Sequence, residues 1–228
     1  MNGFSTANIA EPSAIPTDLS SAFTLDAAPG TDIYATPLPG ARHIFSAPII
    51  HRRLSKASFQ SARVTVRSKW SLQFDQGGLV FIIPSAQAPE PDSSTAQAKE
   101  THPEWVKAGI EVNDGAAYVS VVAKSRDNWC DWSLTPVPGA DQVLGERSEQ
   151  LEVTLYMTRS KNALMVWIVS GEKDFLVRKI PWVFLDDNSR LSMEDILVGV
   201  YAARPDPDGE ATQKQDALSV SFDGFYVI

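Results

Sequence analysis

The sequence has one cysteine, Cys130, so an intrachain disulfide is excluded. Basic residues are also scarce: 20 Lys and Arg stand against 28 Asp and Glu, a formal net charge of −8 at pH 7. Nucleic acids and anionic membranes are bound through clustered basic side chains. The charge balance therefore predicts that neither a nucleic acid nor a membrane surface is the partner.

Metal and cofactor signals are missing as well. The three histidines, His43, His51 and His102, are scattered and lack the spacing of zinc ligands. There is no P-loop and no dinucleotide-binding fingerprint. We therefore expect no metal and no cofactor, although Asp206 and Asp208 leave weak calcium binding open.

Long apolar runs are absent too. No stretch approaches the roughly 18 apolar residues that span a bilayer. The first residues, MNGFSTANIAEPSAIPTDLSSAF, lack the basic and apolar regions of a signal peptide. The sequence predicts a soluble, reduced, cytoplasmic protein.

Alternation of period two dominates the chain and indicates β-strands. Turn signals rich in Gly, Asn and Asp separate the apolar runs, and we count ten to twelve strands. We expect an all-β fold, a two-sheet antiparallel β-sandwich, with residues 1–22 as a weakly ordered lead-in and 23–228 as one domain. Residues 23–48, broken by prolines, are predicted to be irregular extended chain, and residues 84–101 a variable insertion or a mobile flap. Only 191–197 is expected to form a helical turn, with Ser192 as N-cap.

The two runs 105–112 and 116–124 flank an Asn-Asp-Gly turn and predict a hairpin. Folding it about Asp114-Gly115 gives one apolar face. The other face pairs Glu111 with Tyr118, Gly109 with Ser120, and Lys107 with Val122. A face that mixes charges, small residues and an aromatic ring is typical of a groove in which aromatic rings stack on sugars. The alternatives are that Lys107 and Glu111 face water, or that the proline-rich segment covers the sheet.

Several motifs together resemble a domain family that includes fungal regulation-of-enolase proteins and proteins of bacterial sugar-utilisation clusters. The matching motifs are Asp75-Gln76-Gly77-Gly78-Leu79, Trp105/Lys107/Gly109/Glu111, Asp114-Gly115, Ser120-Val121-Val122 and Asp131-Trp132-Ser133. The resemblance spans about residues 30–228, and the longer loops look like the fungal branch. It implies a concanavalin A-like jelly roll without established catalysis, and a role in sugar metabolism through an enolase-type partner.

The candidate ligand-binding residues come from this groove and its rim. They are Lys107, Glu111, Tyr118, Ser120, Trp167, Tyr201, Asp75, Gln76, Arg126, Asp131 and Trp132. Asp75 has an alternative reading as a turn residue that caps backbone amides. Asp131 and Trp132 could anchor a loop, and Arg178 is an alternative charge for the same face.

Three functions stay open at this point. The first is a non-catalytic, lectin-like protein that binds a small sugar, a sugar phosphate or another metabolite, or a protein, and modulates carbon metabolism. The second is a carbohydrate-active enzyme with Glu111 as acid or base and Asp75 or Asp131 as the second carboxylate, although the closely spaced carboxylates of jelly-roll glucanases are absent. The third is a protein-interaction scaffold. The oligomeric state is open, with a homodimer among the alternatives.

Overall fold

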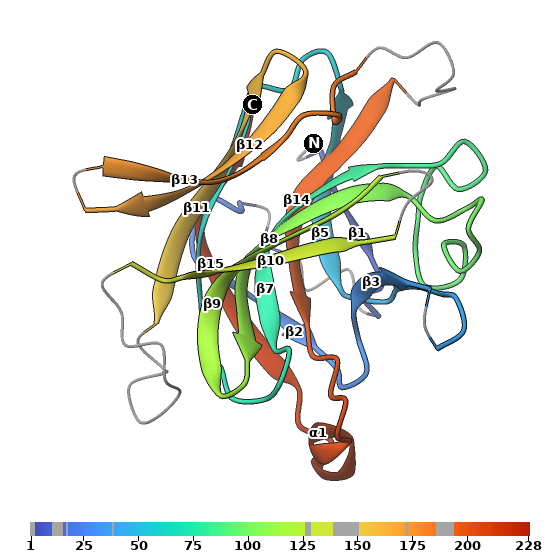
Figure 1. Cartoon of the computed structure of the whole chain (residues 1–228), viewed down its shortest axis with the longest axis vertical. Helices are drawn as coiled ribbons and strands as arrows, with labels where there is room; N and C mark the ends of the chain where they lie inside the picture. Colours follow the sequence, from blue (N-terminus) through green and yellow to red (C-terminus); the bar gives the residue numbers. More distant parts are fainter. Residues whose placement is uncertain are drawn as a thin grey trace.

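The computed structural model describes residues 3–10, 16, 18–37, 39–125, 129–138, 151–171, 173–185 and 194–228. Two large antiparallel sheets pack face to face, with a small third sheet beside them (Figure 1). The seven-stranded sheet runs in the order β1 (Phe4–Ala7), β5 (Ile49–Ser55), β14 (Asp195–Ala203), β7 (Gln76–Ile83), β8 (Glu104–Asn113), β9 (Ala116–Lys124) and β10 (Asp131–Pro136). The six-stranded sheet runs in the order β13 (Lys173–Ile180), β12 (Ala163–Ser170), β11 (Glu152–Ser160), β6 (Ser61–Ser68), β15 (Leu218–Val227) and β2 (Phe23–Ala27). The predicted antiparallel β-sandwich is confirmed.

Alternate residues of each strand build the core between the two sheets. In β8 these are Val106, Ala108, Ile110 and Val112, and they share one buried cluster with Leu155 and other inward residues of the six-stranded sheet. Successive side chains of a strand point to opposite faces. The intervening residues of β8, Lys107 and Glu111 among them, therefore lie on the outer face.

The β8–β9 hairpin has the predicted register. Glu111 pairs with Tyr118, and Lys107 pairs with Val122. Asp114 and Gly115 adopt φ values of 49° and 73°. Positive φ at both central residues is what a tight two-residue hairpin turn requires, and Asp-Gly supplies it at low cost.

The first 48 residues are more regular than the sequence suggests. Within the expected lead-in, β1 pairs with β5, and the ring of Phe4 lies 5.9 Å from that of Phe225. The expectation of irregular chain over 23–48 is also wrong, because β2 joins the six-stranded sheet and β3 (Ile33–Thr36) pairs with β4 (Arg42–Phe45). The prolines fall between these short strands, where they remove no ladder hydrogen bond.

The helical turn is not where the sequence placed it. Residues 195–197 of the predicted turn belong to β14, and Ser192 lies outside the described residues. The helix is α1 (Glu210–Lys214), whose first amides are capped by a residue outside it: Ala211 and Thr212 donate to the Asp206 carboxylate at 3.0 and 2.8 Å. No helix in the described ranges is long and apolar enough to cross a bilayer.

The loop of residues 84–101 contacts the sheet in part through His102. Ala96 is buried against the outer face of the seven-stranded sheet. Its carbonyl oxygen lies 2.8 Å from Nδ1 of His102, while Trp105 Nε1 donates to His102 Nε2 at 3.1 Å. Accepting from the indole requires an unprotonated Nε2, so His102 is neutral with its proton on Nδ1.

Burial, with an added contribution from nearby Lys124, lowers the pKa of His102 to about 4. The unfolded chain has the ordinary value near 6.5 and binds more protons between these two values. Stability is therefore complete above about pH 6.5 and falls as the pH drops toward 4. We expect His102→Gln to remove about 2 kcal/mol of the stability difference between pH 7 and pH 4.5. Urea unfolding at the two pH values measures this, and an unchanged difference would mean that His102 does not titrate here.

Candidate functional site

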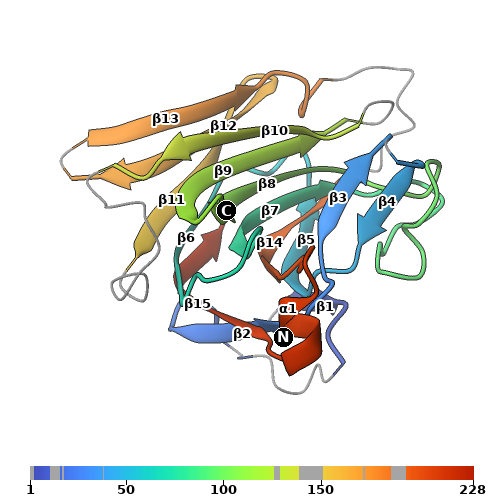
Figure 2. The same ribbon diagram turned by 60° about the horizontal axis from the view of Figure 1, so that its bottom comes forward.

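The outer face of the seven-stranded sheet is largely covered. Figure 2 shows β3 and β4 alongside this sheet, where Ile33 and Phe45 pack with Trp105 and Tyr201 in a second buried cluster. The alternative that the proline-rich N-terminal segment covers Tyr201 is therefore correct. The remaining opening lies between the β3–β4 hairpin and the end of the sheet at β10.

A small cavity of about 170 Å³, lined by both polar and apolar side chains, occupies this opening. Strands far apart in sequence meet there, since Ile33 of β3 shares a buried cluster with Val80 of β7, Trp105 of β8 and Val122 of β9. The lining residues are Asp32, Tyr34, Phe74, Gln76, Lys107, Glu111, Val122 and Trp132. We call this space the outer cavity.

Lys107 forms the charged centre of the outer cavity. Its side chain is 3% exposed, and Nζ donates to Asp32 Oδ1 at 3.1 Å and to Gln76 Oε1 at 2.7 Å. The ammonium also lies 5.8 Å from the ring centroids of Trp105 and Tyr201. A buried charge is tolerated only when it is paired and hydrogen-bonded, and Lys107 meets that condition.

Glu111 forms the opposite wall and is 5% exposed. Ser120 Oγ donates to its Oε2 at 2.5 Å, and Trp132 Nε1 donates to Ser120 Oγ at 3.2 Å. Burial raises the pKa of Glu111 and Asp32 adds to the rise, while Lys107 and the Ser120 hydrogen bond oppose it. Glu111 therefore takes up a proton at higher pH than an exposed glutamate.

Two aromatic rings close the rim above these charges. Trp132 is 43% exposed, and its ring meets that of Phe74 edge-on at 6.1 Å. Phe74 has a left-handed φ of 66°. Non-glycine residues rarely adopt this conformation, which is a form of strain that clusters at functional sites.

The structure separates the predicted site residues into groups. Lys107, Glu111, Gln76 and Trp132 line the outer cavity, Ser120 orients Glu111, and Tyr201 lies beneath with its hydroxyl 3.4 Å from Gln76 Oε1. Tyr118 shares the face beside Glu111 without lining the cavity. Arg126 lies outside the described residues.

Asp75 and Trp167 lie elsewhere. Asp75 is fully buried, accepts the amides of Ser71 and Leu72 at 3.2 and 3.0 Å, and pairs with Arg204. The turn interpretation of Asp75 is the correct one. Trp167 belongs to β12 in the other sheet, where its ring is parallel to that of Tyr156 at 6.0 Å.

Asp131 faces away from the outer cavity and forms an ion pair with Arg178. Neighbouring residues of β10 alternate between the two faces, so Trp132 and Asp131 cannot line the same side.

The sequence did not reveal Asp32, Tyr34 and Phe74. Asp32 and Tyr34 lie in the segment expected to be irregular, although the apolar alternation of Ile33 and Ala35 is a weak strand signal. Within the described ranges, no group of three or more His, Cys, Asp or Glu side chains is arranged to hold a metal ion.

The fold is a two-sheet antiparallel β-sandwich with a small cavity on the outer face of one sheet. The chain belongs to the family described as "Protein of unknown function (DUF1349)", whose profile matches residues 9–226. It is 35% identical over 211 residues to the uncharacterized protein AN7484 of Emericella nidulans, covering 92% of this chain and 90% of the relative.

Solved structures agree with this fold. A functionally unknown protein from Saccharomyces cerevisiae superposes with a TM-score of 0.67 at 21% identity, covering 99% of this chain and 96% of that one. The Bacteroides ovatus protein titled "Xyloglucan PUL GH43B" gives 0.55 at 13% identity, covering 91% of this chain, which spans only 32% of that longer chain. The catalytic domain of a laminarinase from Thermotoga petrophila gives 0.50 at 9% identity, with 90% and 76% covered.

Proposed function

We propose that the outer cavity binds one small neutral carbohydrate and that the protein acts as a lectin-like binding module. The observation that carries the proposal is a hydrogen-bonded network of charges beside an exposed indole. Lys107 binds Asp32 and Gln76, and the Trp132 indole lies exposed at the rim. An indole stacks on the apolar face of a sugar ring, while fixed donors and acceptors read its hydroxyls. A volume of about 170 Å³ suits a single ring.

The charges of the outer cavity favour a neutral sugar over a sugar phosphate. The Lys107 ammonium is already bound to Asp32 and Gln76, and Glu111 faces the same space. A phosphate entering there would meet two carboxylates, and Lys107 is the one cation among the described lining residues. Repulsion between like charges in a partly dry site is strong.

We expect a monosaccharide at 100 times its dissociation constant to add about 2.7 kcal/mol of stability. For a chain of this size that raises Tm by about 5–10 °C. A thermal-shift screen against monosaccharides, sugar phosphates and glycolytic intermediates measures it. Trp132→Ala should abolish the shift because it removes the indole on which the sugar stacks. Glu111→Gln should abolish it because an amide replaces the carboxyl group that accepts hydrogen bonds from the sugar.

Trp167→Ala is the matched control, since it removes an indole from the opposite sheet and should leave the shift intact. A shift that survives in both Trp132→Ala and Glu111→Gln would place the ligand elsewhere. No shift with any sugar would count against the proposal as a whole.

A second function has one specific observation in its favour. Glu111 and Asp32 line the same cavity, and burial raises the pKa of Glu111. A carboxyl with a raised pKa beside a second carboxylate is the arrangement of a glycosidase acid and its partner. The second carboxylate is thus Asp32, in place of Asp75 or Asp131.

Under this alternative, Glu111→Gln should lower the hydrolysis of an aryl xyloside or glucoside by at least about 10²-fold. The amide keeps the size of the side chain and cannot transfer a proton. Turnover measured with purified wild type and Glu111→Gln decides between the two functions. Absence of turnover in the wild type, together with binding that Trp132→Ala removes, would exclude hydrolysis of these substrates and leave the binding module.

A role in carbon metabolism through an enolase-type partner remains part of the proposal and is supported by the sequence resemblance alone. Retention of purified enolase on the immobilised protein tests it. Loss of retention in point variants of the edge strand β13 or of the 84–101 loop, with Trp132→Ala unaffected, would indicate a scaffold that does not use the cavity.

A further inference from the structure

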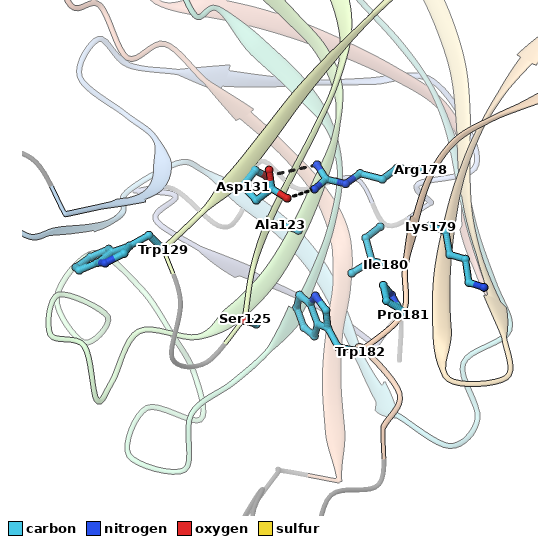
Figure 3. Close-up of a pocket in the computed structure, with 9 residues that line it drawn as sticks. All are labelled: Ala123, Ser125, Trp129, Asp131, Arg178, Lys179, Ile180, Pro181 and Trp182. Carbon is cyan, nitrogen blue, oxygen red and sulfur yellow. Dashed lines mark hydrogen bonds and ion pairs between the residues drawn. The ribbon is translucent and has the colours of Figure 1, made fainter.

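A second and larger cavity, of about 450 Å³, lies at the edge of the sandwich, between the last strand of each large sheet (Figure 3). Its lining comes from the end of β9, the start of β10, the end of β13 and the turn that follows. The lining residues are Ala123, Ser125, Trp129, Asp131, Arg178, Lys179, Ile180, Pro181 and Trp182. We call it the edge cavity. Its volume falls within the range of small-molecule sites.

An ion pair spans the mouth of the edge cavity. Arg178 of β13 reaches across to the other sheet and donates from Nη1 to Val121 O at 3.0 Å and to Ser133 Oγ at 3.1 Å. Its Nη2 donates to Asp131 Oδ2. Figure 3 shows the Arg178 guanidinium facing the Asp131 carboxylate. Arg178 is thus held by the backbone and a hydroxyl as well as by Asp131.

The Asp131 side chain is 76% exposed, against 20% for Arg178. The carboxylate therefore keeps room to accept further hydrogen bonds, while the guanidinium beside it is fixed in place. A donor-rich group and an acceptor-only group side by side match the hydroxyls of a sugar, which both donate and accept.

Part of the edge cavity lining is apolar. Ala123 and Ile180 belong to the main core, and Trp182 packs against it. In Figure 3 the indole of Trp182 rises into the cavity beside Pro181 and near Ser125, whereas the side chains of Trp129 and Lys179 point away from the ion pair. The cavity thus offers the indole of Trp182 together with the Asp131–Arg178 ion pair, whose charges cancel.

We propose that the edge cavity is a binding site for a neutral saccharide of about two rings. Trp182 would stack on one ring, and Asp131 with Arg178 would bind the hydroxyls of that ring or the next. An anionic ligand gains little from the Asp131–Arg178 pair, because the two charges cancel each other. A purely apolar ligand would strip water from the same carboxylate without replacing its hydrogen bonds.

This site is separate from the outer cavity, although both use β10. Trp132 and Val122 are register partners that line the outer cavity, and Asp131 and Ala123 are the next pair, lining the edge cavity. The inference does not rest on the proposed function, because each site has its own indole.

The six tryptophans provide the test, since each contributes one indole N–H signal to the ¹H–¹⁵N spectrum of the labelled full chain. Single Trp→Phe variants assign the signals. Titration with maltose, cellobiose and xylobiose should shift the Trp182 signal with at least one of them, and leave those of Trp70 and Trp167 unchanged. Asp131→Asn should weaken that titration at least tenfold while the spectrum of the free protein is retained.

Glu152→Gln is the matched control, because Glu152 is an exposed carboxylate 3.9 Å from Arg67, away from both cavities. It should leave the titration unchanged. Shifts confined to Trp132 and Trp105 would assign the sugar to the outer cavity and overturn this inference while supporting the proposed function. If the Trp182 signal shifts with benzoate and with none of the disaccharides, the proposal that the ligand is a neutral saccharide is wrong.

Discussion

Asp75→Ala is expected to lower the free energy of unfolding by about 3–5 kcal/mol. Asp75 and Arg204 form a bidentate pair, with Nε to Oδ1 and Nη2 to Oδ2 both at 2.8 Å, and their side chains are 0% and 3% exposed. Removing the carboxylate leaves a buried guanidinium with only Ser71 and Asp216 as side-chain partners, and it also removes the acceptor of two backbone amides in the turn of residues 71–75.

Urea unfolding followed by circular dichroism measures the loss, and Tm should fall by roughly 6–20 °C. Glu90→Ala is the matched control, because Glu90 pairs with Arg53 while it is 67% exposed. Exposed pairs contribute about 0–1 kcal/mol. The double variant Asp75→Leu/Arg204→Met should recover much of the stability, since no unpaired charge then stays buried. A loss for Asp75→Ala no larger than that of Glu90→Ala would refute the structural role of the pair.

Gly109→Ala should cost about 3 kcal/mol or more, the upper part of the range for added volume in a packed site. Gly109 stands between Lys107 and Glu111 on β8 and pairs with Gly78 of β7. A Cβ at Gly109 would lie 2.0 Å from the carbonyl oxygen of Gly77. That contact is with backbone, so no side-chain rotation relieves it, and the β7–β8 ladder itself must separate.

Alanine substitutions at two other glycines should have smaller effects on stability. A Cβ at Gly77 would meet the Val220 side chain at 2.9 Å, a neighbour that can move, so Gly77→Ala should cost less. Gly3 has nothing within 4 Å, and Gly3→Ala should be close to neutral. Thermal unfolding of the three variants should rank them in that order, and equal Tm values for Gly109→Ala and Gly3→Ala would contradict the close approach of β7 and β8. Because Lys107 and Glu111 flank Gly109, loss of sugar binding in Gly109→Ala should accompany the loss of stability.

Much of the fold could be predicted from the sequence, because it depends on interactions between residues that are close together in the chain. The alternation in 105–112 and 116–124, with Asp114-Gly115 between them, fixed the hairpin, its register and the inward face, because strand period and turn geometry are properties of neighbouring residues. The same alternation placed Lys107 and Glu111 together on the outer face. The number of β-rich segments and the scarcity of helix determined the sandwich.

The site itself depended on contacts that period and turn chemistry do not encode. Trp167 looked like a groove residue because an outward aromatic on a strand has the same pattern in either sheet, and only the pairing of β12 with β11 and β13 placed it on the opposite side. Asp32 became the partner of Lys107, 75 residues away, because the short β3–β4 hairpin lies across the seven-stranded sheet. Asp75 turned from a ligand candidate into half of a buried ion pair because Arg204 reaches it from β14's end. Side-chain alternation depends only on neighbouring residues of one strand. Which strand covers which face depends instead on how the whole chain buries its apolar surface.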